Sequence, residues 1–369
     1  MRVSTPRFWV FLSVLTLFSL QAEDGNRPFM STLNHVDTIA SMVPPNGDVN
    51  PYGVAVVPVT TGALVANNIL VSNFNNFRNL QGTGTTIVQV SPSASATLFS
   101  TIVAASLSQF GGCPGGVGLT TAIVALRSGF VIVGSLPTTD GTSATATQPG
   151  CLIVLNSNGD PVGVLSGNGI NGPWNMTALD TGAAATLFVS NVLNGTVAAN
   201  GAVVSQGTIL RIVLSIPING IPSATSYTPI ATTFDERTDP NALVIGPTGL
   251  GLGADGTTLF VADTLRSRIA AIPNALSMTS GPITTVAQGP PLNQPLGLAI
   301  APDGHIITVN AGNGLMVETT PDGKQAAARN VDISHSKNGA GTLFGLAIAF
   351  DGSAIYYVDD GNNTLNALH

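Results

Sequence analysis

Three segments near the C-terminus share one pattern at a fixed spacing, and this repeat restricts the fold more than any other feature of the chain. The segments cover residues 247–273, 295–324 and 344–368. Their matching glycines, Gly249, Gly297 and Gly345, follow one another at intervals of 48 residues. Repeats of roughly 20 to 50 residues are typical of solenoids and propellers, in which one supersecondary unit recurs along the chain.

Each repeat reads as short strands joined by turns. The last one has an apolar run before Asp351-Gly352 and a second run, IYYVD, shortly after it. Weaker copies upstream bring the number of units to six, and they start near residues 50, 116, 172, 246, 294 and 343. Short apolar runs bounded by turn residues indicate strands, and about four strands per unit is typical of a propeller blade. The sequence therefore predicts an all-β, six-bladed β-propeller.

The two ends of the repeated region complement each other. The last unit has only three strand-like runs before His369, and a spare strand-like segment, residues 35–40, precedes the first unit. A ring whose first and last blades did not join would leave exposed strand edges. We therefore expect a single propeller domain over residues 33–369, with the last blade closed by an N-terminal strand.

The fourth unit resembles an NHL repeat. It has Pro247, Gly249, Asp255-Gly256, the Val261-Ala262-Asp263 strand end and Arg268-Ile269 at the positions that the NHL pattern uses. The fifth unit has Asn310 where that pattern has Asp. The resemblance extends unevenly over residues 50–368, and it implies a six-bladed propeller.

The N-terminus reads as a secretory signal peptide, residues 1–22. Arg2 and Arg7 precede an apolar run, residues 8–20, and Ala22 offers a small residue for cleavage. The run is shorter than the roughly 20 residues of a membrane span, and we expect no integral span after cleavage. The alternative is an uncleaved anchor. This pattern predicts a secreted or periplasmic protein.

The chain has two cysteines, Cys113 and Cys151. In an oxidising compartment, two cysteines of one exported chain favour a disulfide. The alternative is two separate buried thiols. No CxxC and no nearby histidine supports a metal site at these positions.

The charge balance restricts the partners. Charged residues are 8% of the chain, the net charge is −7, and the basic residues are scattered. Nucleic-acid binding needs clustered Lys and Arg, so this composition excludes it as a general role. We expect a protein, a glycan or a small molecule to bind the loops of the propeller instead.

A polar residue recurs at the end of the second strand in five units. These candidates for one mouth of the central channel are Asn73, Asn191, Asp263, Asn310 and Asp359. Carboxamide and carboxylate oxygens suit Ca²⁺ or Mg²⁺. The other interpretation is structural, because Asn and Asp also stabilise turns through bonds to their own backbone. Three further candidates lie at blade entries and could line the channel: Asn50, Asn175 and Gln294.

The main functional hypothesis is an exported propeller that binds an unidentified ligand and requires no cofactor. The alternative is a divalent-metal-dependent propeller hydrolase of the gluconolactonase or lactonase type. Those enzymes carry a Glu metal ligand in the first blade, usually as Glu-Gly-Pro, whereas this chain has Asn50-Pro51-Tyr52-Gly53. No catalytic residue is assigned, and the charge-dense run 235–239 is predicted to cap a loop between units three and four.

Overall fold

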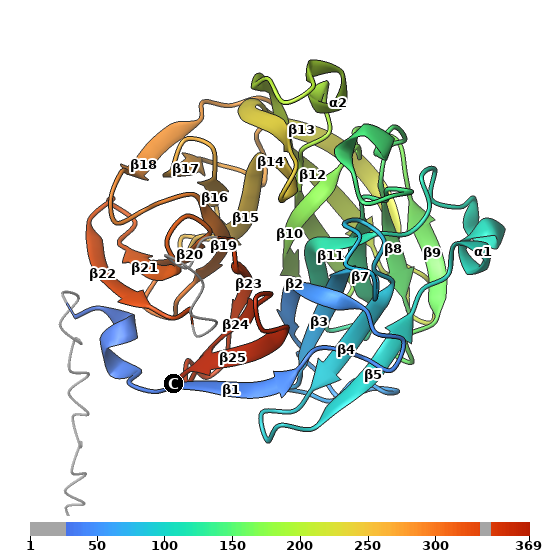
Figure 1. Ribbon diagram of the computed structural model, residues 1–369, viewed down its shortest axis with the longest axis horizontal. Helices are drawn as coiled ribbons and strands as arrows, with labels where there is room; N and C mark the ends of the chain where they lie inside the picture. The colour runs from blue at the N-terminus through green and yellow to red at the C-terminus, as the bar shows by residue number, and fades with distance from the viewer. Residues whose placement is uncertain (1–26, 333–340) are drawn as a thin grey trace, which may run out of the picture.

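The computed structural model describes residues 27–332 and 341–369, and their strands form six sheets around a central axis (Figure 1). The predicted signal peptide lies outside the described residues. Each sheet is an antiparallel blade whose first strand lies nearest the axis. The prediction of an all-β, six-bladed propeller is confirmed.

Blades 1 to 3 occupy the first half of the ring. Blade 1 consists of β2 (Val49–Val56), β3 (Ile69–Asn75), β4 (Thr86–Val90) and β5 (Ala96–Thr101). Blade 2 consists of β6 (Leu119–Ala125), β7 (Val131–Ser135), β8 (Cys151–Leu155) and β9 (Pro161–Leu165). Blade 3 consists of β10 (Pro173–Asp180), β11 (Ala184–Asn191), β12 (Val204–Ser215), β13 (Ser223–Asp239) and β14 (Leu243–Ile245).

Blades 4 to 6 contain the three best repeats. Blade 4 consists of β15 (Pro247–Leu252), β16 (Leu259–Asp263), β17 (Arg268–Ile272) and β18 (Thr284–Gln288). Blade 5 consists of β19 (Pro295–Ile300), β20 (Ile306–Asn310), β21 (Leu315–Thr319) and β22 (Gln325–Asn330). Blade 6 consists of β23 (Leu343–Ile348), β24 (Ile355–Asp359), β25 (Thr364–Leu368) and β1 (Val36–Ser41).

The helices are single turns in the connections. They are η1 (Phe29–Thr32), α1 (Ala104–Leu107), η2 (Ser108–Phe110), η3 (Ser143–Thr145) and α2 (Thr196–Ala199). Over the described ranges, no helix is long and apolar enough to cross a membrane.

Packing between blades explains the continuous apolar runs in the sequence. Middle strands such as β7, β8, β16 and β17 are buried along their whole length. Each middle strand has a neighbouring blade on both faces, so both sets of alternating side chains are apolar. Outer strands such as β9 and β18 are partly exposed.

The repeated glycine marks the place where neighbouring inner strands come closest. A Cβ atom added at Gly297 or Gly345 would come closer than 3.0 Å to the backbone oxygen of Phe344 or Tyr52, respectively. Each of these oxygens belongs to the inner strand of the next blade. Only glycine fits such an approach without displacing the neighbouring strand. The glycines recur every 48 residues because each blade makes this close contact with the inner strand of the next blade.

The N-terminal strand closes the ring. Strand β1 pairs antiparallel with β25, from Val36 opposite Leu368 to Ser41 opposite Thr364. The inner strands β2 and β23 also contact each other, as do the other neighbouring inner strands. Closure of the last blade by the N-terminal strand is thus consistent with the prediction from the repeat count.

Blade 3 departs from the repeat. Residues 235–239 do not cap a loop, as the sequence suggested, but form the end of the 17-residue strand β13. This end pairs with β14, with Arg237 opposite Ile245 and Asp239 opposite Leu243. Pairing with β14 stabilises residues 235–239 as part of a strand, although their charged composition indicates a loop.

The predicted disulfide is present. Cys113 and Cys151 are bonded, and their Cα atoms lie 5.5 Å apart. The bond ties the loop before β6 to the buried start of β8. In the chain-entropy model, closing a loop of 38 residues contributes about 3 to 4 kcal/mol to stability.

Candidate functional site

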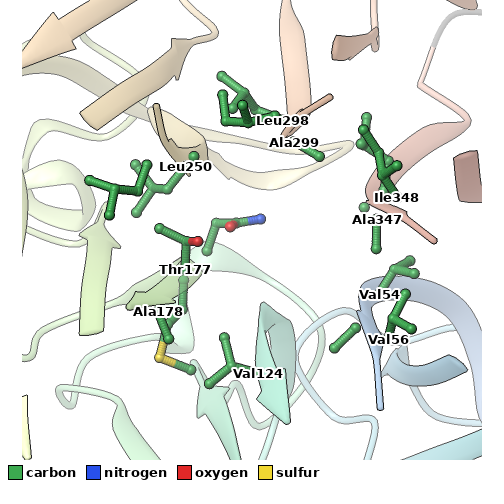
Figure 2. Close-up of a pocket in the computed structure, with 18 of the residues that line it drawn as sticks. Val54, Val56, Val124, Thr177, Ala178, Leu250, Leu298, Ala299, Ala347 and Ile348 are labelled. Carbon is green, nitrogen blue, oxygen red and sulfur yellow. The ribbon is translucent and has the colours of Figure 1, made fainter. Parts of the chain in front are cut away.

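A cavity of about 500 Å³ lies on the axis of the propeller, between the inner strands. All six inner strands contribute to its wall. Figure 2 shows the side chains of Val54, Val124, Leu250, Leu298 and Ile348 around it. We call this cavity the axial channel.

The wall of the axial channel is uncharged. Among the residues that the structure describes, its lining contains no Asp, Glu, Lys, Arg or His. Its polar side chains are Thr121, Asn175 and Thr177, and the rest of the described wall is aliphatic residues, glycine, one methionine and one phenylalanine. A wall of this kind favours apolar surface over ions, because an unpaired charge there would lose its hydration.

One end of the channel is closed by large aromatic side chains, and three of the four directly precede the blade glycine or its equivalent. Tyr52 stacks on Phe344 with ring centroids 3.9 Å apart and on Phe74 at 4.4 Å. Trp174 meets Phe74 edge-on at 5.5 Å. All four rings are at most 5% exposed. We call this group the aromatic plug (Tyr52, Phe74, Trp174 and Phe344).

The hairpin of β13 and β14 covers the same end. Leu243 and Val244 of this hairpin are 1% exposed and belong to the apolar cluster that contains the aromatic plug. The Gln81 side-chain amide of blade 1 donates to the Asn241 carbonyl at the hairpin tip (2.9 Å). The hairpin therefore reaches from blade 3 to blade 1 across the plugged end.

The other end of the channel is open. Leu179, at the end of β10, is 37% exposed, and Phe350, in the turn after β23, is 62% exposed. Both residues also line the channel. An exposed apolar rim that continues into an apolar cavity gives a small molecule one route of entry.

The five candidates for a channel-mouth ring are completely buried, each at the end of the second strand of its blade. The residues concerned are Asn73, Asn191, Asp263, Asn310 and Asp359. Each has a hydrogen-bond partner: for example, Asn310 donates to the Pro291 carbonyl, 19 residues away (2.8 Å), and Asp359 accepts from the nearby Gly361 N–H (3.0 Å). Within the described ranges, no hydrogen bond joins any two of the five.

Each of these five side chains also keeps one buried polar atom without a hydrogen-bond partner in the described part of the chain. The atoms are Asn73 Oδ1, Asn191 Nδ2, Asp263 Oδ1, Asn310 Oδ1 and Asp359 Oδ2. The Asp359 bond has the form that the turn interpretation requires, a backbone N–H of its own turn, whereas Asn73 and Asn310 donate to carbonyls that are distant in the sequence. The unpaired atoms leave room for a ligand or ordered water. Both interpretations of this ring stay predictions.

The three blade-entry candidates do not form one site. Asn50, near the start of β2, and Gln294, directly before β19, adopt left-handed backbone conformations, with φ of 65° and 52°. Asn175 lies within β10 and lines the axial channel. Of the eight predicted polar site residues, Asn175 is thus the one that the channel lining includes.

The residues that close the channel were not predicted from the sequence. Tyr52, Trp174 and Phe344 each precede a blade glycine or its equivalent, and the repeat alignment could have drawn attention to that position. It holds apolar residues in blades 1, 3, 5 and 6, with Leu296 in blade 5. A propeller hydrolase that held an axial metal at this end would need oxygen ligands there, and these side chains do not fit that requirement.

One group of residues has the donor types of a metal site, but it lies outside the channel. Ligand atoms of Asp303, His305 and Glu318 lie within 4.8 Å of one another. Glu318 already accepts from the Phe29 N–H (2.6 Å), the Met30 N–H (2.7 Å) and the His305 ring (2.5 Å). Its carboxylate is therefore occupied in joining the N-terminal segment to blade 5.

Three buried carboxyl groups have strongly shifted acidity. Burial raises the pKa of Glu236, in β13, to about 8, and interaction with the Asn194 backbone opposes this rise. Burial and repulsion by neighbouring carboxylates raise the pKa of Asp359 to about 6 and that of Asp360 to about 8. All three groups therefore keep their proton to a higher pH in the folded protein than in the unfolded chain.

Neither a protein-family model nor a curated protein matches the chain. Solved structures do. The chain is similar to a gluconolactonase from Xanthomonas campestris (11% identity, TM-score 0.57), with 90% of this chain and 88% of that chain covered. It is also similar to a luciferin-regenerating enzyme (9% identity, TM-score 0.57), with 90% and 94% covered.

A third similar structure is regucalcin from Agrobacterium tumefaciens, described as a calcium-binding protein. The identity is 12%, the TM-score is 0.50, and 90% of this chain and 93% of that chain are covered. At such identities the likeness concerns the fold. The chain has the six-bladed propeller fold that these lactonase-like and regucalcin-like proteins share.

Proposed function

We propose that the protein binds a neutral, largely apolar small molecule in the axial channel. The observation that carries this proposal is the wall itself, which is uncharged, mostly aliphatic, closed by the aromatic plug and open beside Leu179 and Phe350. Ligand sites are typically apolar cavities of roughly 300 to 1,000 Å³ with a few polar groups. The axial channel meets this description.

The energetics agree with modest affinity. Burying one methylene group gains about 0.8 kcal/mol, so a chain of eight to ten methylenes gains roughly 6 to 8 kcal/mol before the cost of association. After an association cost of at least about 4 kcal/mol, roughly 2 to 4 kcal/mol remain, which corresponds to millimolar or weaker dissociation constants from the methylenes alone.

The test uses the neutral dye N-phenyl-1-naphthylamine, whose fluorescence rises in an apolar site. We expect saturable binding to the wild type, because the channel can bury the dye. Ala347→Phe and Ala178→Phe each add a ring inside the channel, and each should weaken dye binding at least tenfold. Ala144→Phe, in the exposed turn η3, is the matched control and should bind as the wild type does.

Thermal melts establish that each variant is folded before its binding is compared. Saturable binding that both channel variants retain at full strength would contradict the proposal, and so would an absence of binding to the folded wild type. Two channel variants in different blades are used because one of them could fail to fold.

The second candidate is a divalent-metal-dependent propeller hydrolase. The comparisons support it more than they support a pure binding protein, because similar structures include a gluconolactonase and a regucalcin described as binding calcium. Residues that could contribute oxygen or nitrogen ligands are Asp303, His305 and Glu318. Such an ion would act as a Lewis acid toward an ester or lactone carbonyl.

Metal content and melting temperature test this second candidate. Stoichiometric Ca²⁺ or Mg²⁺ in the purified protein, with a melting temperature that falls in EDTA, would support it and justify a lactone and ester screen. A metal-free protein whose melting temperature ignores both EDTA and added Ca²⁺ would contradict it.

We also propose a repeat family and a cellular compartment for this protein. We place the repeats with NHL-type repeats on the Pro-x-Gly and Asp-Gly pattern, and we place the mature chain, one domain over residues 33–369, outside the cytoplasm. The bond between Cys113 and Cys151 supports an oxidising compartment. Mass spectrometry of the exported protein would show whether cleavage follows Ala22.

A further inference from the structure

Asn175 occupies a position that blades 1, 4, 5 and 6 give to glycine (Gly53, Gly249, Gly297 and Gly345). In blade 1, the Gly53 N–H donates to Ser72 Oγ (3.0 Å), and Ser72 Oγ donates to the carbonyl of Thr120 in the next blade (2.7 Å). Blade 3 repeats this arrangement. The Asn175 N–H donates to Ser190 Oγ (3.0 Å), and Ser190 Oγ donates to the carbonyl of Thr248 in the next blade (3.0 Å).

The repeat pattern does not require a side chain at this position. A Cβ atom at Gly53 would come closer than 3.0 Å to Ser72 and Ile123, so the glycine there is a packing requirement. Blade 3 has space for a carboxamide at the equivalent position, and that space belongs to the axial channel. A polar residue that departs from the repeat inside an apolar cavity is a sign of function rather than of packing.

The polar groups of Asn175 are available. No hydrogen bond engages its carboxamide in the described residues, although its backbone N–H and carbonyl are both bonded to Ser190. Thr177 lies two residues further along β10, and its hydroxyl is also unengaged within the described ranges. Side chains two residues apart on a strand point to the same face, so both groups lie on one wall of the channel (Figure 2 shows Thr177).

Thr121 differs from these two residues. It also lines the channel, but its hydroxyl donates to the Trp174 carbonyl. Asn175 and Thr177 are thus the lining side chains with free hydrogen-bonding capacity. A carboxamide offers both donors and an acceptor, and a hydroxyl offers one donor and acceptor sites.

We infer that Asn175, with Thr177, selects among apolar ligands by binding one uncharged carbonyl or amide group on an aliphatic molecule. The inference rests on the proposed function and names the ligand class for the same channel. Neutral donors and acceptors in a wall without charge favour a neutral amide, ester or ketone. A carboxylate or an ammonium group would enter without a counter-charge and would lose its hydration.

The experiment measures competition against N-phenyl-1-naphthylamine by decanamide, decanoate and decylamine at one chain length. The wild type should bind decanamide most tightly. Asn175→Leu keeps the approximate volume and removes the polar groups, so it should weaken decanamide roughly five- to tenfold, the usual effect of one hydrogen bond. Thr177→Val should act in the same direction with a smaller effect. Thr225→Val, on the outer strand β13 of the same blade, is the matched control and should leave the order of ligands unchanged, because its hydroxyl bonds the Val213 carbonyl outside the channel lining.

Dye binding separates failure of this inference from failure of the proposed function. If the dye binds and the channel-filling variants block it, but decanamide competes equally against the wild type and Asn175→Leu, the assignment of Asn175 is wrong and the channel proposal stands. A wild type that prefers decanoate or decylamine would also overturn the assignment. If the dye does not bind, the channel proposal itself fails.

Discussion

Blades 4 and 5 differ at one pair of facing positions, which holds Asp263 and Arg268 in blade 4. Asp263 is fully buried, and Arg268 Nε donates to its Oδ2 at 2.7 Å across strands β16 and β17. Burial raises the pKa of Asp263, and the neighbouring arginine opposes that rise. In blade 5, the equivalent residues are Asn310 and Leu315. They adjoin the facing pair Val309 and Met316 of strands β20 and β21. An uncharged pair therefore suffices at this place in the fold.

Arg268→Leu should destabilise the protein by about 3 to 5 kcal/mol, because it leaves the buried Asp263 carboxylate without its partner. The double variant Asp263→Asn, Arg268→Leu gives blade 4 the pair that blade 5 already has. It should recover most of the loss. Urea denaturation of the wild type, the single variant and the double variant measures both effects. Equal losses in the two variants would show that the ion pair is not the reason for the cost.

The N-terminal segment shows at the element scale how a distant residue holds a short piece of chain. Glu318, 288 residues from Met30 in sequence, accepts the first N–H groups of η1, which have no partner within the turn. Arg329 donates to the carbonyls of Leu33 and Asn34. Strand β1 then pairs with β25. Blades 5 and 6 thus both anchor the segment that closes the ring.

Glu318→Gln should loosen this segment, because hydrogen bonds to a charged group contribute about 1.5 to 3 kcal/mol each. Hydrogen exchange of the Met30 amide should become roughly 10- to 100-fold faster, while amides in the buried strands β16 and β17 should be unaffected. Asp37→Asn is the matched control. Asp37 bonds His369 at the surface (2.8 Å), and such exposed pairs contribute little. Equal protection of Met30 in both variants would contradict the role of Glu318.

Elements with a regular signal could be predicted from the sequence, and elements decided by tertiary contact could not. Strand β1 was predictable because the last blade lacks a strand and the chain has a spare one. Strand β14 was not, since its three residues form a strand only by pairing with the charged end of β13. The bonds of Glu318 depend on an approach between segments far apart in sequence, and no local pattern records that approach.

At the scale of the whole molecule, buried acids make stability depend on pH. The pKa of Glu236 is about 8 in the folded protein and about 4.5 when exposed in the unfolded chain. Between these values the folded state holds a proton that the unfolded state has lost. The stability that this group contributes is therefore fully present below about pH 4.5 and is lost as pH rises to about 8. The raised pKa values of Asp359 and Asp360 act in the same direction.

Glu236→Gln should therefore raise the melting temperature at pH 8 and change it little at pH 4.5. The expected gain at pH 8 is about 1 to 3 kcal/mol, the usual cost of an unsatisfied buried group. Glu318→Gln is the control, and it should lower the melting temperature, because it weakens the hydrogen bonds that the Glu318 carboxylate accepts. Melts of both variants at pH 4.5 and pH 8 test the sign, and a destabilised Glu236→Gln at pH 8 would contradict this account.

The candidate site was less accessible from sequence than the fold. The repeat revealed the ring and the inner strands, and it drew attention to Asn175. It did not reveal which end of the channel is closed, because that depends on Tyr52, Trp174 and Phe344 meeting across three blades. In the sequence, aromatic residues at blade entries have the same pattern as ordinary core residues. Only the assembled ring shows that they meet on the axis.

The central claim is that the axial channel takes apolar ligands rather than an ion. The most direct test is a crystal structure grown with CaCl₂ and pressurised with xenon, with anomalous data that locate both elements. Xenon binds apolar cavities, so the account predicts a xenon atom on the axis among Leu250, Leu298 and Ile348 and no Ca²⁺ there. A Ca²⁺ ion on the axis, in a channel without xenon, would contradict it.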